Sequence, residues 1–169
     1  MKKINILKKD PITEIITNSL AKLPTPSSIP YLWNIGFLLG ITLLIQISTG
    51  LVLSINFVRE TTIAFESVIH IMRDVDKGWV IRYIHINGAS LFFMLIYTHI
   101  ARGIYFNSPS KIPIVWGSGV IILLISMITA FIGYVLPWGQ ISFWGATVIT
   151  RIISAIPYLG LHITTWVWG

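Results

Sequence analysis

The segment "RYIHINGASLFFMLIYTHIARG", residues 82–103, decides the fold, because it joins a long apolar stretch to two histidines and two flanking arginines. It belongs to an apolar run over 79–106, which is long enough to cross the roughly 30 Å of hydrocarbon in a bilayer. Polar side chains are costly inside a membrane and therefore mark functional positions. The fold and the function both depend on what His85 and His99 do there.

The composition is that of a membrane protein. The 169 residues are 54% hydrophobic and 11% charged, with a mean hydropathy of +0.80. The absence of cysteine excludes disulfides, zinc–thiolate sites and iron–sulfur ligation within these residues. The net charge is +6, but the tryptophans lie in or beside apolar segments rather than among basic residues, which argues against nucleic acid as a partner. The N-terminus has the features of neither a signal peptide nor a transit peptide.

The hydrophobic pattern predicts an all-α membrane protein in three parts. Residues 1–32 form an amphipathic surface segment, with Ile12, Ile15, Ile16, Leu20 and Leu23 at helical spacing. Residues 33–136 contain three membrane-spanning helices over 33–57, 79–106 and 114–136, with a polar connection at 58–78. Residues 137–169 form interfacial helices and lead toward a further span.

Three spans place the N-terminal segment and the loop between the second and third spans on one side of the membrane. That side carries seven basic residues against five on the other, where four acidic residues offset them. This weak asymmetry predicts an N-terminus in the matrix or cytoplasm.

His85 and His99 are fourteen residues apart, which in an α-helix is about 21 Å along the axis and about 40° short of four full turns. Both rings therefore face the same way, near opposite ends of the hydrocarbon. Neutral imidazole is a metal ligand. The alternative is that each histidine only hydrogen-bonds a neighbouring helix.

The two arginines mirror each other around the histidines. Arg82 precedes His85 by three residues and Arg102 follows His99 by three, so each pair shares a helix face. A haem needs imidazole for its iron and cations for its propionates at the polar edge. A single arginine could merely extend its head group to the membrane surface, but the mirrored pair favours two stacked haems.

Glycines repeat the same spacing on the flanking spans. Gly36 and Gly50 are fourteen apart, as are Gly119 and Gly133. Because the flanking spans run opposite to the central one, Gly36 and Gly119 should lie level with His99, and Gly50 and Gly133 level with His85. Glycine would let a flat macrocycle approach the backbone, although small residues also allow close helix packing.

Together with these features, several stretches of the sequence resemble mitochondrial cytochrome b of the quinol–cytochrome c reductase (bc1) complex. They are "WNIGFLLG", "QISTG", "RDVDKGWVIRYIHINGASLFF", "THIARG", "TAFIGYVLPWGQISFWGATVIT" and "SAIPYLG". The resemblance covers nearly all of 20–169 and is most specific in "GYVLPWGQISFWGATVI". It implies the family's helices A, B and C and the interfacial helices that follow helix C.

The resemblance implies two b haems in a four-helix bundle, each with one histidine from helix B and one from helix D. His85 would ligate the low-potential haem near the quinol-oxidising side, and His99 the high-potential haem near the matrix side. The haem pockets would also include Arg82, Arg102, Gly36, Gly50, Gly119, Gly133, Trp33 and Trp116. The quinol-oxidation pocket would include Met127, Phe131, Tyr134, Gly145, Val148 and Ile149, and the quinone-reduction pocket would include Trp33, Asn34 and Phe37.

Two departures from the family stand out. Phe37 replaces a serine that is common in the family. The family also continues into helices D to H, which carry the second pair of histidines and a Pro-Glu-Trp-Tyr motif. We expect these helices on a separate polypeptide or a continuation of this chain. His70 and His162 lie outside the spans on one side and do not replace the missing ligands.

The resemblance further implies ubiquinone and ubiquinol as substrates. It implies the Rieske iron–sulfur protein, cytochrome c1, other bc1 subunits and lipids as partners, a dimeric complex, and the mitochondrial inner membrane with the N-terminus in the matrix. Two alternatives differ in class. One is a haem-binding membrane module without quinol turnover, in which two copies pair their histidines. The other is a structural fragment.

Overall fold

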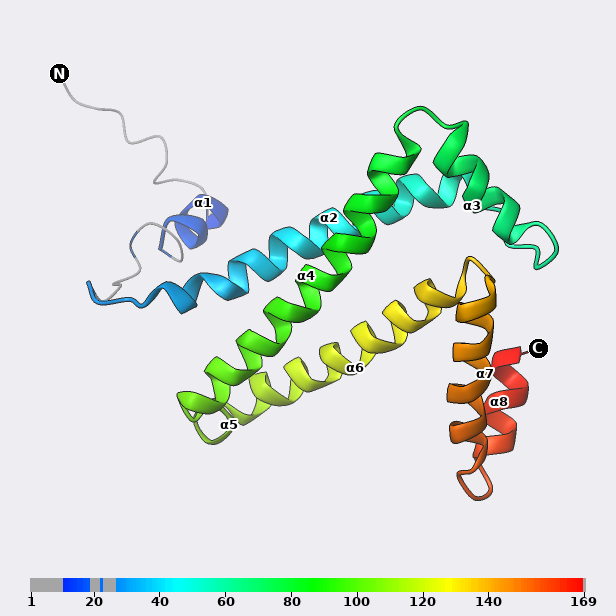
Figure 1. The fold of residues 1–169 in the computed structure, drawn as a ribbon. Helices are drawn as coiled ribbons and strands as arrows, with labels where there is room; N and C mark the ends of the chain where they lie inside the picture. Colours follow the sequence, from blue (N-terminus) through cyan, green and yellow to red (C-terminus); the bar gives the residue numbers. More distant parts are fainter. Residues whose placement is uncertain (1–10, 19–21, 23–26, 169) are drawn as a thin grey trace. The chain divides into compact units, whose positions relative to one another are not determined.

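The computed structural model describes residues 11–18, 22 and 27–168. All regular structure in these residues is helical, which confirms the all-α membrane class. The chain divides into two units, residues 1–33 and 34–169. In chain order (Figure 1) the elements are α1 (Pro11–Ile16), η3 (Tyr31–Asn34), α2 (Ile35–Asn56), α3 (Ala64–Arg73), α4 (Gly78–Tyr105), α5 (Ser108–Lys111), α6 (Pro113–Val135), α7 (Gln140–Ser154) and α8 (Gly160–Trp168).

The first unit contains the predicted surface helix. Helix α1 exposes Ile12, Ile15 and Ile16. That this segment lies on a membrane surface stays a prediction. Leu20 and Leu23, which extend the same pattern in the sequence, lie outside the described residues.

Three segments are long and apolar enough to cross a membrane: Tyr31–Asn56, Gly78–Tyr105 and Pro113–Val135. They match the three predicted spans to within about two residues at each end, which is the usual uncertainty of a helix boundary. Few of their residues are buried within the structure: 6% of the most apolar 18-residue stretch in each of the first two spans and none in the third. Such outward-facing apolar surface is suited to lipid or to further transmembrane helices.

Within the second unit, α2 and α4 pack along each other, and α3 packs on both near the connection between them. The short helix α5 joins α4 to α6, and Pro113 occupies the first turn of α6, where a missing N–H costs nothing. After α6, Pro137 and Trp138 turn the chain, with Trp138 in the left-handed region at φ 52°. Helix α7 then begins at Gln140 and packs against α8.

The predicted polar connection at 58–78 contains the amphipathic helix α3, which was not predicted from the sequence. This helix buries Ala64, Val68 and Ile71, which recur at three- and four-residue intervals. Charged residues on its other face, such as Glu66 and Arg73, lower the mean hydropathy and concealed the pattern.

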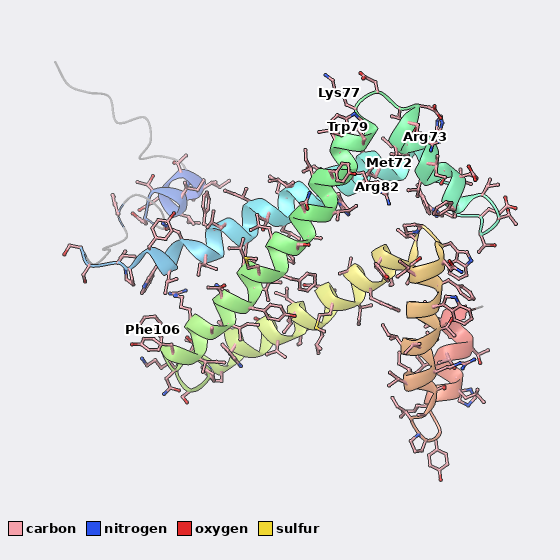
Figure 2. All side chains as sticks on the ribbon, viewed as in Figure 1. Met72, Arg73, Lys77, Trp79, Arg82 and Phe106 are labelled. Atoms are coloured by element: carbon pink, nitrogen blue, oxygen red, sulfur yellow. The ribbon has the colours of Figure 1, made fainter. Side chains whose placement is uncertain are left out.

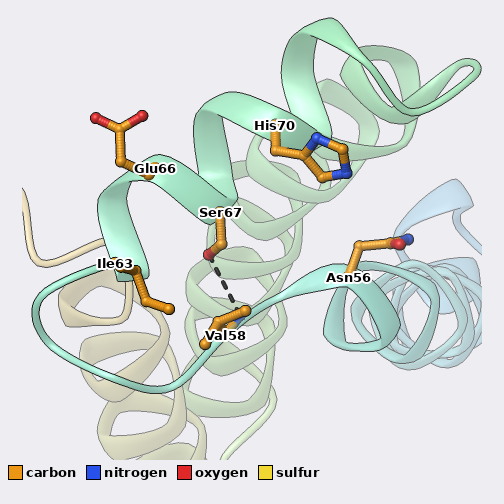
Figure 3. Close-up of a pocket in the computed structure, with 6 residues that line it drawn as sticks. All are labelled: Asn56, Val58, Ile63, Glu66, Ser67 and His70. Atoms are coloured by element: carbon orange, nitrogen blue, oxygen red, sulfur yellow. Dashed lines mark hydrogen bonds between the residues drawn. The ribbon is translucent and has the colours of Figure 1, made fainter.

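A buried hydroxyl holds α3 against the end of α2. Ser67 Oγ accepts a hydrogen bond from the backbone N–H of Val58 at 3.2 Å and donates one to the Ala64 carbonyl at 2.7 Å. The contact borders a shallow hollow of about 280 Å³ (Figure 3), which is lined by Asn56, Val58, Ile63, Glu66, Ser67 and His70.

Candidate functional site

Helix α4 presents both histidines to the glycines of α2. A Cβ built on Gly50 would lie 3.2 Å from Cε1 of His85, and one built on Gly36 would lie 3.6 Å from Cε1 of His99. Each imidazole therefore packs directly on the α2 backbone. The two helices run in opposite directions, and each histidine meets the glycine that the spacing predicts.

The glycines of α6 are placed differently. A Cβ added at Gly119 or Gly133 would meet nothing within 4 Å. The structure therefore brings neither glycine against a histidine, and the space in front of both is open. Their predicted role beside a macrocycle stays a prediction.

His85 makes a hydrogen bond across the helix pair. Its Nδ1 lies 2.8 Å from Oγ1 of Thr49, the residue before Gly50 on α2. The same hydroxyl is 2.6 Å from the carbonyl oxygen of Ile45, one turn earlier. Sequence reasoning missed Thr49, although its place directly before a glycine at a histidine level was a usable signal.

The arginines lie toward opposite ends of α4. Arg82 is half-buried near Trp79 at the end that follows α3, and Phe106 marks the other end (Figure 2). There the guanidinium carbon of Arg102 stands 5.9 Å from the centroid of the Phe106 ring, a distance at which cation–π attraction operates. The predicted role of the two arginines toward haem propionates stays a prediction.

Trp116 belongs to the same end of the helix pair as Arg102. A Cβ on Gly103 would lie 2.6 Å from Cζ3 of Trp116, so the indole of α6 packs directly on α4 at the residue after Arg102. Trp116, a predicted haem-pocket residue, therefore contacts the residue that follows Arg102, the arginine predicted to neutralise a propionate.

The side-chain amide of Gln46 lies between α2 and α4, at a level between those of the two histidines. The side chain of Gln46 on α2 packs against Gly88 of α4, and its Nε2 has no hydrogen-bond partner in the part of the chain that the structure describes. A buried donor without an acceptor costs about 1–3 kcal/mol. Gln46 is therefore a second polar group of α2 that faces the histidine-bearing helix.

The predicted quinol-oxidation residues come from α6 and α7. Tyr134 and Gly145 meet across the Pro137 turn, where a Cβ on Gly145 would lie 3.5 Å from Cε1 of Tyr134. The remaining members lie on the same two helices, and all but Phe131 are exposed: Met127, Phe131, Val148 and Ile149.

The predicted quinone-reduction residues are adjacent in the sequence to the start of α2 or lie in its first turn. Phe37 is 72% exposed, next to the glycine that packs on His99. Asn34 immediately precedes α2. Trp33 belongs to the first unit and is exposed.

The side chains that could bind a metal indicate whether the site suits a bare ion or a haem. Among the described residues, no three or more His, Cys, Asp or Glu side chains lie together as a site for a bare ion. Each level instead offers one imidazole against a glycine backbone, with an arginine three residues away. Haem iron takes single axial imidazoles, and its ring needs flat space beside the backbone. The residues present therefore fit a haem at each level.

The other two histidines lie apart from this arrangement. His70 is exposed on α3 and forms a 2.8 Å hydrogen bond through Nδ1 to the Asp74 carboxylate. His162 is exposed on α8. Neither side chain lies against the α2–α4 pair in the way that His85 and His99 do.

Comparison with known proteins shows the family of the chain. The chain is similar to a solved "Hyperthermophilic respiratory Complex III" chain, with 33% identity and a TM-score of 0.80, over 88% of this chain and 39% of the other. It thus spans well under half the length of that relative. Residues 20–169 match the cytochrome b/b6/petB family. The chain, a multi-pass membrane protein whose second span carries His85 and His99, belongs to the cytochrome b/b6 family.

Proposed function

We propose that the chain is the part of a di-haem b electron-transfer subunit that supplies one axial ligand to each haem of a quinol–cytochrome c oxidoreductase. The observation that carries the proposal is the pair of imidazoles on one face of α4, each packed on a glycine of α2. Family membership supports haem and quinone chemistry in general. The assignment of each residue is our own.

In this proposal, haem supplies one-electron redox chemistry, and the protein supplies ligation, orientation and charge. His85 and His99 present their imidazoles to the two irons. Arg82 and Arg102 neutralise propionates toward the two surfaces, where a cation in a partly apolar setting acts strongly. Gly36 and Gly50 leave room for the imidazoles that pack on them, and Gly119 and Gly133 leave room for the macrocycles. Trp33 and Trp116 complete the pocket walls.

The second axial ligand of each iron comes from outside residues 1–169 in this proposal, because each level holds one histidine. Two imidazoles on one iron close both axial positions, which favours electron transfer over oxygen chemistry. We propose that these ligands lie on a helix D-like segment of the C-terminal half of cytochrome b (helices D to H), on a separate chain or a continuation.

We further propose that ubiquinol is oxidised beside Tyr134, Gly145 and their neighbours, on the side of His85. The Tyr134–Gly145 contact supports this placement, since it joins two of the proposed pocket residues. Ubiquinone is reduced beside Trp33, Asn34 and Phe37, on the side of His99. His85 and His99 lie about 21 Å apart along α4, and haems held by them would supply one-electron redox chemistry near both sides of the membrane.

The proposed setting is a dimeric complex in the mitochondrial inner membrane, with the N-terminus in the matrix. The excess of basic residues on the N-terminal side supports the orientation. The proposed partners are the Rieske iron–sulfur protein, cytochrome c1, other bc1 subunits and lipids. The similarity to a respiratory Complex III chain supports an assembly of this kind.

The test is to titrate the haems of the purified complex by optical redox spectroscopy. The expected native result is two b-type components. His85→Leu should remove one and His99→Leu the other, while the exposed His70→Leu, the matched control, should keep both. Retention of both components in either ligand variant would contradict the proposal. Two intact haems that quinol does not reduce would instead favour a haem module without quinol turnover.

A further inference from the structure

We infer that Thr49 is a positioning residue that fixes the tautomer of His85 and makes the haem at this level electronically different from the haem at His99. The inference rests on the proposed function, in which His85 ligates a haem iron. Thr49 lies on α2 and would touch neither the iron nor the quinones, and it would act through the hydrogen bonds of its hydroxyl group.

The hydroxyl of Thr49 has one proton to donate. Its oxygen lies 2.6 Å from the Ile45 carbonyl oxygen and 3.3 Å from that of Gln46. Two oxygens at 2.6 Å without a proton between them would repel each other, so this short contact requires the hydroxyl proton to point to Ile45.

The contact with His85 must then run in the other direction. Thr49 Oγ1, which has already donated its proton to Ile45, can only accept from His85 Nδ1 at 2.8 Å. The imidazole therefore carries its proton on Nδ1. In a neutral ring this leaves the lone pair on Nε2, which is the atom needed by a metal.

Ordinary helix chemistry explains the bond to Ile45 but leaves the contact with His85 unexplained. Hydroxyls in apolar helices routinely donate to the carbonyl one turn earlier. Thr42, seven residues before Thr49 on α2, is an example: it is buried and lies 3.0 Å from the carbonyl oxygens of both Leu38 and Leu39. What distinguishes Thr49 from Thr42 is that its hydroxyl also has a partner on another helix, His85.

Among the residues that the structure describes, none at the His99 level is an acceptor equivalent to Thr49. Ile35 stands before Gly36 just as Thr49 stands before Gly50, and its side chain is buried and apolar. In the described residues, no side-chain hydrogen bond to the His99 ring parallels the one that Thr49 makes to His85. The two ligands therefore differ in their hydrogen bonding although their spacing to the glycines is the same.

The difference in hydrogen bonding predicts which haem has the lower reduction potential. An acceptor on the far nitrogen of a ligating histidine makes the ring a more basic ligand. A more basic ligand stabilises the oxidised iron, which carries the higher positive charge, and so lowers the reduction potential. The bond from Thr49 to Ile45 polarises the hydroxyl and strengthens its acceptor oxygen. Thr49 should therefore lower the potential of the His85 haem alone.

The experiment is a redox titration of both haems in the purified complex with Thr49→Val, which keeps the shape of the side chain and removes the acceptor. We expect the reduction potential of the His85 haem to rise and that of the His99 haem to stay unchanged. We also expect the affinity for the haem at His85 to fall by about 10- to 100-fold. Thr49→Ser should restore native values. Thr42→Val, the matched loss of a buried hydroxyl on the same helix, should change neither potential.

The inference is overturned if Thr49→Val leaves the His85 haem potential unchanged, shifts both haems equally, or shifts it no more than Thr42→Val does. Failure of the proposed function would look different, because His85→Leu would then keep both haems. If Thr49→Val does not assemble, an experimental map of the native complex decides. Thr49 Oγ1 within hydrogen-bond distance of Nδ1, with Nε2 toward iron, supports the inference, and a separation beyond 3.5 Å rejects it.

Discussion

Gly50→Ala should weaken the haem at the His85 level, because the added methyl group would meet the ligand itself. The new Cβ would lie 3.2 Å from Cε1 of His85, which is closer than ordinary van der Waals contact. The imidazole must retreat by a few tenths of an ångström. That movement also strains its 2.8 Å hydrogen bond to Thr49.

The magnitude follows from the cost of overpacking, which is about 1–3 kcal/mol for an added methyl-sized group in a well-packed site. At 1.4 kcal/mol for each factor of ten, haem affinity at this level should fall by about 5- to 140-fold. The helix itself does not lose stability, because alanine is favoured over glycine in a helix interior by about 0.8–1.0 kcal/mol.

The assay is haem retention per complex, resolved into the two components by redox titration. Gly40→Ala is the matched control on the same helix, because a Cβ there meets nothing within 4 Å. It should leave both haems in place. Gly36→Ala, where the contact to His99 is 3.6 Å, should act more weakly on its haem. Equal effects of Gly50→Ala and Gly40→Ala on the His85 haem would refute the reasoning.

Other substitutions test the remaining parts of the site. Arg82→Leu should lower the potential of the His85 haem, measured by redox titration, because the more negative reduced haem loses a neutralising cation. Gly145→Val should slow quinol oxidation while both haems stay bound, since its side chain would crowd Tyr134 at a position where a Cβ already makes contact at 3.5 Å. Ser67→Ala should reduce stability by about 0.5–1.5 kcal/mol in thermal unfolding, because a backbone N–H loses its buried acceptor.

The arginine and serine predictions each have a matched control in the same chain. Arg102→Leu should shift the other haem, and equal shifts of both haems by either arginine variant would contradict the assignment of levels. Ser118→Ala removes an exposed hydroxyl that donates only within its own helix, and it should cost less than Ser67→Ala. Loss of haem in Gly145→Val would show that the glycine supports the bundle rather than a quinol pocket.

The spans were predictable because length and hydropathy alone define a membrane-crossing helix. The pairing of Gly50 with His85 and Gly36 with His99 was also predictable, since equal spacing on antiparallel helices puts the matching residues level. Helix α3 was missed because its charged face dilutes a short apolar pattern. The same face points away from the buried residues that pack on α2 and α4.

The Thr49–His85 hydrogen bond could not be derived from spacing, because it depends on how α2 is rotated against α4. A rotation of one residue, about 100°, would turn the hydroxyl away from the ring. The open space at Gly119 and Gly133 is a related case. Their spacing predicts a level, but it does not determine which side chains or groups fill the space in front of them.

The central claim is that His85 and His99 each hold a haem iron, and an experimental map of the intact complex tests it most directly. The account predicts two irons, each with an axial Nε2 from one of these histidines, separated by about 21 Å along α4. Each iron should take its opposite ligand from a helix D-like segment. A single iron, or irons held by any other residue of this chain, would contradict the account.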